Sequence, residues 1–376
     1  MRVTVAAVAT AALLALEPVG TGARFLLVQS DTRNLDTDIS TAAYHSLTAV
    51  TNYLYAKQHD ADYLYFVFNQ SRPAFLSDAK RVYGAVFQNS SNEQSTEVSG
   101  TYEKKGPSAY HPVLRQFRAA PWTKLLALWN ISQSAMAAAA TGRYSHIFFL
   151  DSDAVVNPKF HRRSLYDALR DWSSAPCHVL HSRPPGVSAS KAAAIFLDNS
   201  PFEPYDKFLC DGAFVLNLGF QGVSSDHHFA INRGHETGPA FISRFIKEWW
   251  DHDVESKDFT HWWRHLENTN RNFNHAYEQD SLWDQLYNSP RNSWRISENT
   301  VCVVAEPQFP PSRNDSLWVN HVGSPWEKDR GRILKTHLAE LRVTEQDFAR
   351  ISQIITSTAS VEGFAVDIAA NMATCS

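Results

Sequence analysis

Apolar runs and helix-spaced apolar positions alternate along the first half of the chain. Residues 24–29 and 62–69 are mostly apolar and short, which is typical of buried strands, and residues 41–57 carry apolar side chains at helical spacing. A later run, residues 147–150, is apolar at every position and indicates a strand buried on both faces. The order strand, helix, strand predicts an α/β fold with a central, mostly parallel sheet flanked by helices.

Two carboxylates follow the apolar run at 147–150. Asp151 and Asp153 are separated by Ser152. Side chains alternate along an extended backbone, and a turn at Ser152 would bring the two carboxylates closer together. Two hard oxygen ligands suit a divalent cation such as Mg²⁺ or Mn²⁺, which in turn can hold a diphosphate. The alternative is that the two aspartates only end a strand and begin a turn.

Two classes of enzyme share this local pattern. One is the metal-dependent glycosyltransferase, and the other is the phosphatase that uses an aspartate, here Asp151, as its nucleophile. Asp153 and Val155 fit both classes. The pair lies in the middle of this chain, and no Gly-Asp-x-x-x-Asp sequence follows it, which favours the transferase.

Further polar residues are expected near the same edge of the sheet. Ser30, Asp31 and Thr32 follow the strand 24–29, and ligands of open α/β sheets sit beyond the carboxyl ends of strands, so these residues are candidates for contacting a nucleotide. Pro121 opens a predicted helix whose first turn contains Lys124. A cation there opposes the helix dipole, which favours an anion such as a phosphate facing Lys124 over a solvated lysine.

Composition narrows the classes of partner and the compartment. The chain has 376 residues, 35 basic against 39 acidic, with no basic block that would indicate nucleic acid. Residues 1–23 contain a basic residue, an apolar run and then small residues, which predicts a cleaved signal peptide or a short membrane anchor. The expected location is the Golgi or endoplasmic reticulum lumen, in agreement with four glycosylation sequons, at Asn69, Asn89, Asn130 and Asn314.

The cysteines do not form a metal-binding pattern. There are four, without Cys-x-x-Cys spacing, and one or two lumenal disulfides or buried free thiols are open: Cys177, Cys210, Cys302 and Cys375. We expect one catalytic domain over residues 24–342. Residues 343–376 should form a helix and tail packed on it, because Phe348 and Ile351 fall on one helical face.

Five segments of the chain together resemble glycosyltransferase family 34, the galactosyl-, mannosyl- and xylosyltransferases. They occur in the family's order over roughly residues 25–330, and they are Pro-Trp-Thr-Lys at 121–124, Phe-Phe-Leu-Asp-Ser-Asp-Ala-Val at 148–155, Asn-Leu-Gly at 217–219, Tyr-Glu-Gln-Asp-Ser-Leu at 277–282 and Trp-Val-Asn-His-Val-Gly at 318–323. The resemblance implies a GT-A (Rossmann-like) nucleotide-diphospho-sugar transferase fold. It also implies a UDP- or GDP-sugar donor, a glycan or glycoprotein acceptor, and retention of anomeric configuration.

The resemblance also implies a metal site and its ligands. Mn²⁺, with Mg²⁺ as the second choice, would be held by Asp151, Asp153 and His321. The residues support the third ligand independently, because 317–322 alternates as a strand that places His321 near its end, and imidazole is a good ligand for Mn²⁺.

The remaining roles rest on the same resemblance. Glu278, Gln279 and Asp280 would line the β-face of the donor sugar as the catalytic group, although Glu278 and Gln279 could instead only begin a helix. Contacts to the nucleotide sugar would come, besides the residues already named, from Ser152, Asn217, Gly219 and Lys328. The chain departs from the family at residues 211–214 and 222–228, around the donor-sugar segment. A lumenal carbohydrate-binding protein without catalytic activity is the third alternative.

Overall fold

The computed structural model describes the chain from residue 24 to residue 374, with gaps. The described residues are 24–68, 77, 81, 109–114, 116–118, 120–139, 143–174, 195–199, 209–219, 238–251, 282, 301–304, 318–322, 329–363 and 365–374. The predicted signal or anchor segment, residues 1–23, lies outside them. Within the described part, no helix is long and apolar enough to cross a bilayer.

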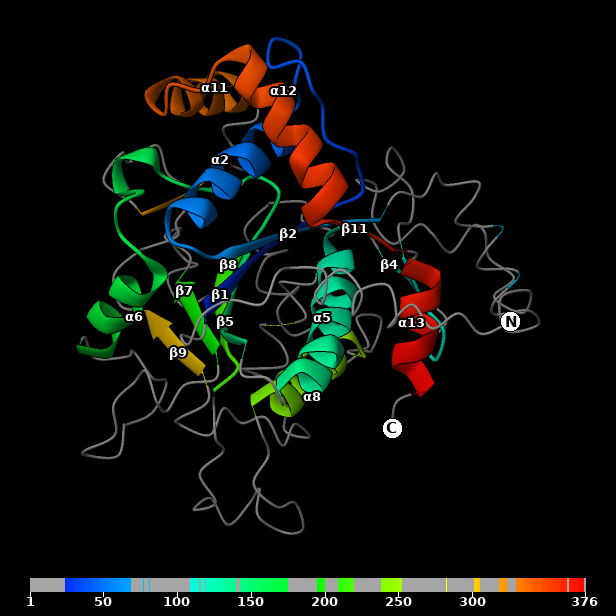
Figure 1. Cartoon of the computed structure of the whole chain (residues 1–376). Helices are drawn as coiled ribbons and strands as arrows, with labels where there is room; N and C mark the ends of the chain where they lie inside the picture. Colours follow the sequence, from blue (N-terminus) through cyan, green and yellow to red (C-terminus); the bar gives the residue numbers. More distant parts are fainter. Residues whose placement is uncertain are drawn as a thin grey trace, which may run out of the picture.

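A seven-stranded, mostly parallel sheet forms the centre of the protein (Figure 1). Its strands, in spatial order, are β11 (Ser360–Glu362), β2 (Asp62–Val67), β1 (Arg24–Asp31), β5 (Tyr144–Leu150), β8 (Leu209–Asn217), β7 (Ile195–Asn199) and β9 (Val301–Val304). β8 is antiparallel to both β5 and β7, whereas the other neighbouring strands are parallel. The predicted fold class, α/β with a mainly parallel sheet, is therefore confirmed.

Helices cover both faces of the sheet (Figure 1). One face carries α5 (Thr123–Ala139), α8 (Gly238–Trp250) and α13 (Ala365–Thr374). The other carries α2 (Tyr44–Gln58), α6 (Leu165–Ser174), α11 (Arg330–Glu340) and α12 (Glu345–Ile354). The strands supply both cores by alternation: Ile147 and Phe149 of β5 pack with the first group, and Phe148 and Leu150 with the second. This is why the run 147–150 is apolar at every position.

Short elements complete the described structure. They are β3 (Ala109–His111) paired with β4 (Gln116–Arg118), β6 (Ala154–Val156) paired with β10 (Val319–His321), two 3-10 turns, η2 (Ala120–Trp122) and η3 (Pro158–Phe160), and a π-helical turn, η5 (Ile355–Ala359). The 3-10 turn η2 takes up the residues around Pro121, so the helix predicted to start there begins at Thr123. Asn130 is 2% exposed inside α5, and its sequon cannot carry a glycan on the folded protein.

The carboxyl-terminal segment is part of both layers. α12 begins at a capping box formed by Thr344 and Asp347, and it buries Phe348 and Ile351 in the core that contains α2. β11 then joins the edge of the sheet beside β2, and α13 packs in the core with α5. Residues after 342 thus add a strand as well as the predicted helix. Of the cysteines, Cys177 and Cys375 lie outside the described residues.

Asn52 of α2 gives the first testable prediction. Its amide donates to the Ala154 carbonyl and accepts from the Val156 amide, both at 2.9 Å, and it is fully buried. Asn52→Ala leaves two buried backbone groups of β6 without this partner, so we expect the free energy of unfolding to fall by about 2–4 kcal/mol. Urea denaturation of the full-length chain measures it.

Thr51→Val is the matched control for Asn52→Ala. The Thr51 hydroxyl is also buried in α2, but it donates only to the Leu47 carbonyl of its own helix. Its loss should cost under about 1 kcal/mol, since that carbonyl keeps its helical partner. Equal losses in the two variants would contradict a specific role of Asn52 in holding β6.

Candidate metal centre

The site lies at the edge of the sheet where β1, β2 and β5 have their carboxyl ends. Gln29 of β1 is in register with Leu150, the last residue of β5, so Ser30 and Asp151 both lie one residue further toward this edge. The Asp151 amide donates to the Gly212 carbonyl at 2.7 Å, and a turn then leads into β6. The two aspartates therefore stand where a buried strand ends and the chain reverses, at the usual ligand-binding edge of such a sheet.

Buried polar side chains hold the backbone of the turn. The Thr48 hydroxyl donates to the Ser152 carbonyl at 2.6 Å, and the Gln29 amide donates to the Asp151 carbonyl at 3.0 Å. Tyr63 donates in turn to the Gln29 side chain at 2.6 Å. These bonds go to backbone carbonyls, so they hold the turn without occupying the carboxylate oxygens of the two aspartates.

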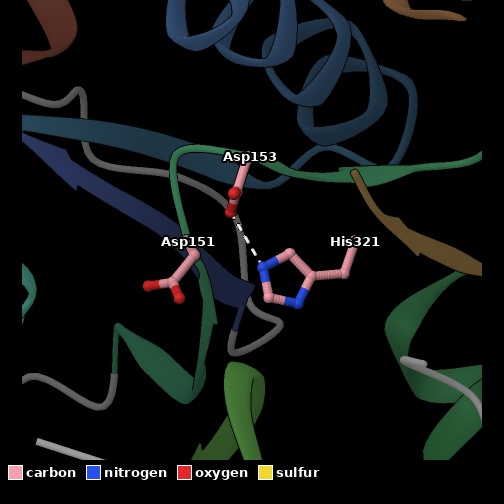
Figure 2. A group of neighbouring side chains, drawn as sticks. All are labelled: Asp151, Asp153 and His321. Carbon is pink, nitrogen blue, oxygen red and sulfur yellow. Dashed lines mark hydrogen bonds and ion pairs between the residues drawn. The ribbon is translucent and has the colours of Figure 1, made fainter. Parts of the chain in front are cut away.

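His321 reaches the aspartates through a two-stranded ribbon. β10 pairs antiparallel with β6, which places His321 opposite Ala154, and the Val322 amide donates to the Asp153 carbonyl at 2.8 Å. The imidazole Nε2 lies 2.8 Å from Asp153 Oδ1, although the two residues are 168 positions apart in sequence. Figure 2 shows the ring projecting toward Asp153.

The three side chains form a set that could hold a divalent metal ion. One ligand atom from each of Asp151, Asp153 and His321 lies within 4.8 Å of the others. The side chains of Asp153 and His321 are each 19% exposed, and that of Asp151 is 28% exposed, so an ion can reach them. Two carboxylates and an imidazole suit Mn²⁺ or Mg²⁺, with the imidazole favouring the softer Mn²⁺. The residues present therefore fit the implied metal.

Basic groups balance the two carboxylates. Lys124 Nζ lies 3.3 and 3.4 Å from the Asp151 carboxylate oxygens, and its side chain is only 2% exposed. Arg330 Nη2 lies 3.3 Å from Asp153 Oδ2. Burial raises the pKa of Asp153, but the neighbouring His321 and Arg330 outweigh burial and lower this pKa to about 2. Asp153 is therefore held as a carboxylate, the form that binds a metal.

Gly212 lets the imidazole approach the turn. A Cβ on this residue would lie 2.5 Å from His321 Cε1 and 2.7 Å from Nδ1. Gly212 is buried in β8, and its carbonyl pairs with Asp151. Gly212, in the segment 211–214 where the sequence departs from the pattern of glycosyltransferase family 34, thus lies directly against the metal centre.

The predicted nucleotide contacts of β1 lie beside this centre. Ser30 and Asp31 end β1 at the same edge as Asp151, and Thr32 follows. Asp31 already pairs with Arg33, whose Nε and Nη2 lie 2.8 and 2.7 Å from its two oxygens. The contact of Ser30, Asp31 and Thr32 with a nucleotide stays a prediction, as does that of Ser152.

The structure corrects the prediction for Asn217 and Gly219. Asn217 is paired with His146, near the start of β5. His146 precedes Asp151 by five residues, so Asn217 lies about 16 Å from Asp151 along the strand direction. The Asn217 side chain accepts a bond from the Gly219 amide at 3.0 Å, which closes a local turn. Because β8 is antiparallel to β5, its carboxyl end lies at the opposite edge of the sheet from the metal centre, so these two residues are not contacts of a ligand held there.

Glu278, Gln279, Asp280 and Lys328 lie outside the described residues. Sequence reasoning missed Arg330, which is the cation found beside Asp153. The resemblance points to Lys328 as the cation after His321, and Arg330 is two residues beyond Lys328.

The chain was compared with protein-family models, curated proteins and solved structures. No protein-family model matches the chain, and no curated protein matches it. A solved structure with some likeness is a glycosyltransferase involved in the glycosylation of the major capsid of PBCV-1. It is 11% identical, the match covers 83% of this chain and 99% of that chain, and the TM-score is 0.40.

Proposed function

We propose that the protein is a metal-dependent glycosyltransferase of the GT-A type. It would move a hexose or pentose from a UDP- or GDP-sugar to a glycan or glycoprotein, with retention of configuration, in the lumen of the secretory pathway. The observation that carries the proposal is the convergence of Asp151, Asp153 and His321, from segments 168 residues apart, with one ligand atom of each within 4.8 Å of the others.

The surroundings of the triad support a nucleotide-sugar donor. The carboxyl end of β1 provides Ser30, Asp31 and Thr32 beside Asp151, where a nucleoside could bind. A donor whose diphosphate rests on the metal centre would then lie along the edge of the sheet. Both parts of the proposed site would then rest on strand ends, which are rigid supports.

The chain's own residues account for the expected chemistry. A bound divalent ion would stabilise the negative charge that develops on the departing nucleoside diphosphate. Lys124, buried and facing Asp151, supplies a fixed positive charge at the same point. The segment with Glu278, Gln279 and Asp280 is proposed to line the β-face of the donor sugar, where retention requires a weak nucleophile or same-face attack rather than a strong base.

The aspartate-nucleophile phosphatase is less well supported. Such an enzyme closes its site with an acidic pair on another strand, whereas β10 brings His321 to Asp153. The metal-binding group found among the described residues contains no third carboxylate.

A nucleotide-sugar screen tests the proposal. The full-length chain is incubated with Mn²⁺ and each UDP- or GDP-sugar, and melting temperature and donor turnover are measured. We expect one donor to raise the melting temperature in the presence of Mn²⁺ and to be turned over. Cleavage of p-nitrophenyl phosphate through an aspartyl-phosphate, without turnover of any donor, would favour the phosphatase. No nucleotide affinity under any metal condition would favour a binding protein.

Lys124 gives the second testable prediction. Lys124→Met should lower donor turnover about 100-fold, because one fixed positive charge is lost where the leaving group becomes negative. Mn²⁺ binding, measured by calorimetry, should persist and become tighter, since Asp151, Asp153 and His321 remain and the cation that competes for Asp151 is gone. The control is Lys57→Met, an exposed lysine in the last turn of α2. Unchanged turnover in Lys124→Met would assign Lys124 only to neutralising Asp151.

A further inference from the structure

Arg330 is held at the metal centre by three contacts. Its Nη2 lies 3.3 Å from Asp153 Oδ2, its Nε donates to the Val322 carbonyl at 2.6 Å, and its guanidinium carbon lies 4.1 Å from the centre of the Tyr44 ring. The side chain is 10% exposed. An arginine fixed this firmly beside a candidate metal ligand has a defined position toward anything that the metal binds.

A second arginine continues the same row. The guanidinium carbon of Arg33 lies 4.7 Å from the centre of the Tyr44 ring, and Arg33 pairs with both oxygens of Asp31. Two ion pairs, Asp31–Arg33 and Arg330–Asp153, thus lie between the end of β1 and the metal centre, and both arginines contact the Tyr44 ring. This row joins the proposed nucleoside end of the donor site to the metal centre.

The position of Arg330 has opposite consequences for a metal ion and for an anion. A guanidinium 3.3 Å from Asp153 competes with a cation for the same carboxylate, so it should weaken the binding of a metal ion alone. When an ion takes Asp153, the guanidinium loses its carboxylate partner and is repelled by the ion. A diphosphate on that ion would restore a partner, and a guanidinium fork matches phosphate oxygens well.

We propose that Arg330 exchanges Asp153 for the diphosphate when metal and donor bind, and thereby couples the two binding events. This inference rests on the proposed function, and it adds a residue and a binding order to it. Such coupling is reciprocal: the metal strengthens diphosphate binding, and diphosphate strengthens metal binding, by the same factor.

Calorimetry on the full-length chain tests the exchange. Mn²⁺ alone is titrated first, and inorganic pyrophosphate is then titrated at saturating Mn²⁺. In Arg330→Met we expect Mn²⁺ alone to bind about 10-fold more tightly, because its competitor is gone, and pyrophosphate to bind about 10- to 100-fold more weakly, because a charge-assisted fork is lost. Arg330→Lys should keep part of the pyrophosphate affinity through its charge.

Arg332→Met is the matched control. Arg332 is on the same helix, α11, is 69% exposed and pairs with Asp329 at 3.3 Å. Both affinities should equal those of the wild type. If Arg330→Met does not fold, as judged by circular dichroism, Arg330→Lys carries the test, because losing the fork should still weaken pyrophosphate measurably.

Two results would overturn the exchange. One is a wild-type chain that does not bind pyrophosphate with Mn²⁺, and the other is unchanged pyrophosphate affinity in the folded Arg330 variants, even if Mn²⁺ affinity rises. The proposed function fails separately. A wild-type chain that binds Mn²⁺ and pyrophosphate as expected, but turns over no nucleotide sugar, would support the role of Arg330 and contradict the transferase.

Discussion

Asp153→Asn is expected to lower metal-dependent donor turnover about 1,000-fold, which corresponds to about 4 kcal/mol of transition-state stabilisation. Asp153 is bonded to His321, paired with Arg330 and part of the three-residue metal group. An amide is nearly the same size but cannot neutralise a cation, so the fold should remain while the ion is lost. Calorimetry with Mn²⁺ and a turnover assay on the same preparation measure both effects.

Asp171→Asn is the control for this substitution. Asp171 is a 56% exposed aspartate that pairs with Arg163 on the surface, and its loss should change neither Mn²⁺ affinity nor turnover. If Asp153→Asn kept full donor turnover, the proposed centre would be wrong. If the variant also kept cleavage of p-nitrophenyl phosphate through an aspartyl-phosphate on Asp151, the phosphatase would replace it.

Local patterns in the sequence predict individual strands and the residues that follow them. The all-apolar run 147–150 becomes a strand with a core on each face, and the carboxylates after it reach the sheet's binding edge. The three proposed metal ligands meet although one of them comes from a distant segment. The resemblance to glycosyltransferase family 34 predicts that meeting, and the structure achieves it through β10, which pairs with β6 in a separate two-stranded sheet.

The apolar pattern of a strand does not indicate whether the strand runs parallel or antiparallel to its neighbours. An apolar strand at 209–217 would look the same whichever way it ran, and its similarity to a donor-binding segment suggested that Asn217 faces the ligand. β8 instead runs against β5, which carries Asn217 to the far edge and brings Gly212 beside Asp151. Because β8 is antiparallel to β5, the end of residues 209–217 that lies at the metal centre is the one containing Gly212, not the one containing Asn217.

Contacts that arise only from tertiary packing could not be predicted from the sequence either. Lys124 was expected to face an anion, and the anion found is the Asp151 carboxylate. Arg330, the first residue of α11, lies beside Asp153 because its side chain donates to the carbonyl of Val322, the residue after β10. No local spacing rule relates these residues, since their approach depends on the pairing of β6 with β10.

Gly212→Ala should damage the centre without removing any ligand. The new methyl group would lie 2.5 Å from an imidazole carbon of His321, well inside contact distance, and the backbone of Gly212 is fixed by its bond to Asp151. The ring must therefore leave the position in which it is bonded to Asp153. A displacement of about 1 Å at a reacting centre can cost about 100-fold in rate, and we expect turnover to fall by about that factor and Mn²⁺ affinity by about 10-fold.

A double-mutant cycle shows whether the Gly212→Ala effect acts through the imidazole. In a chain that already carries His321→Ala, the methyl group has no ring to displace, so adding Gly212→Ala should change Mn²⁺ affinity by less than about 2-fold. Gly331→Ala, whose Cβ would meet no atom within 4 Å, controls for the loss of a glycine and should leave affinity and turnover unchanged. An equal loss of affinity with and without His321 would mean that Gly212 supports the strand rather than the approach of the third ligand, and the centre would then depend on Asp151 and Asp153 alone.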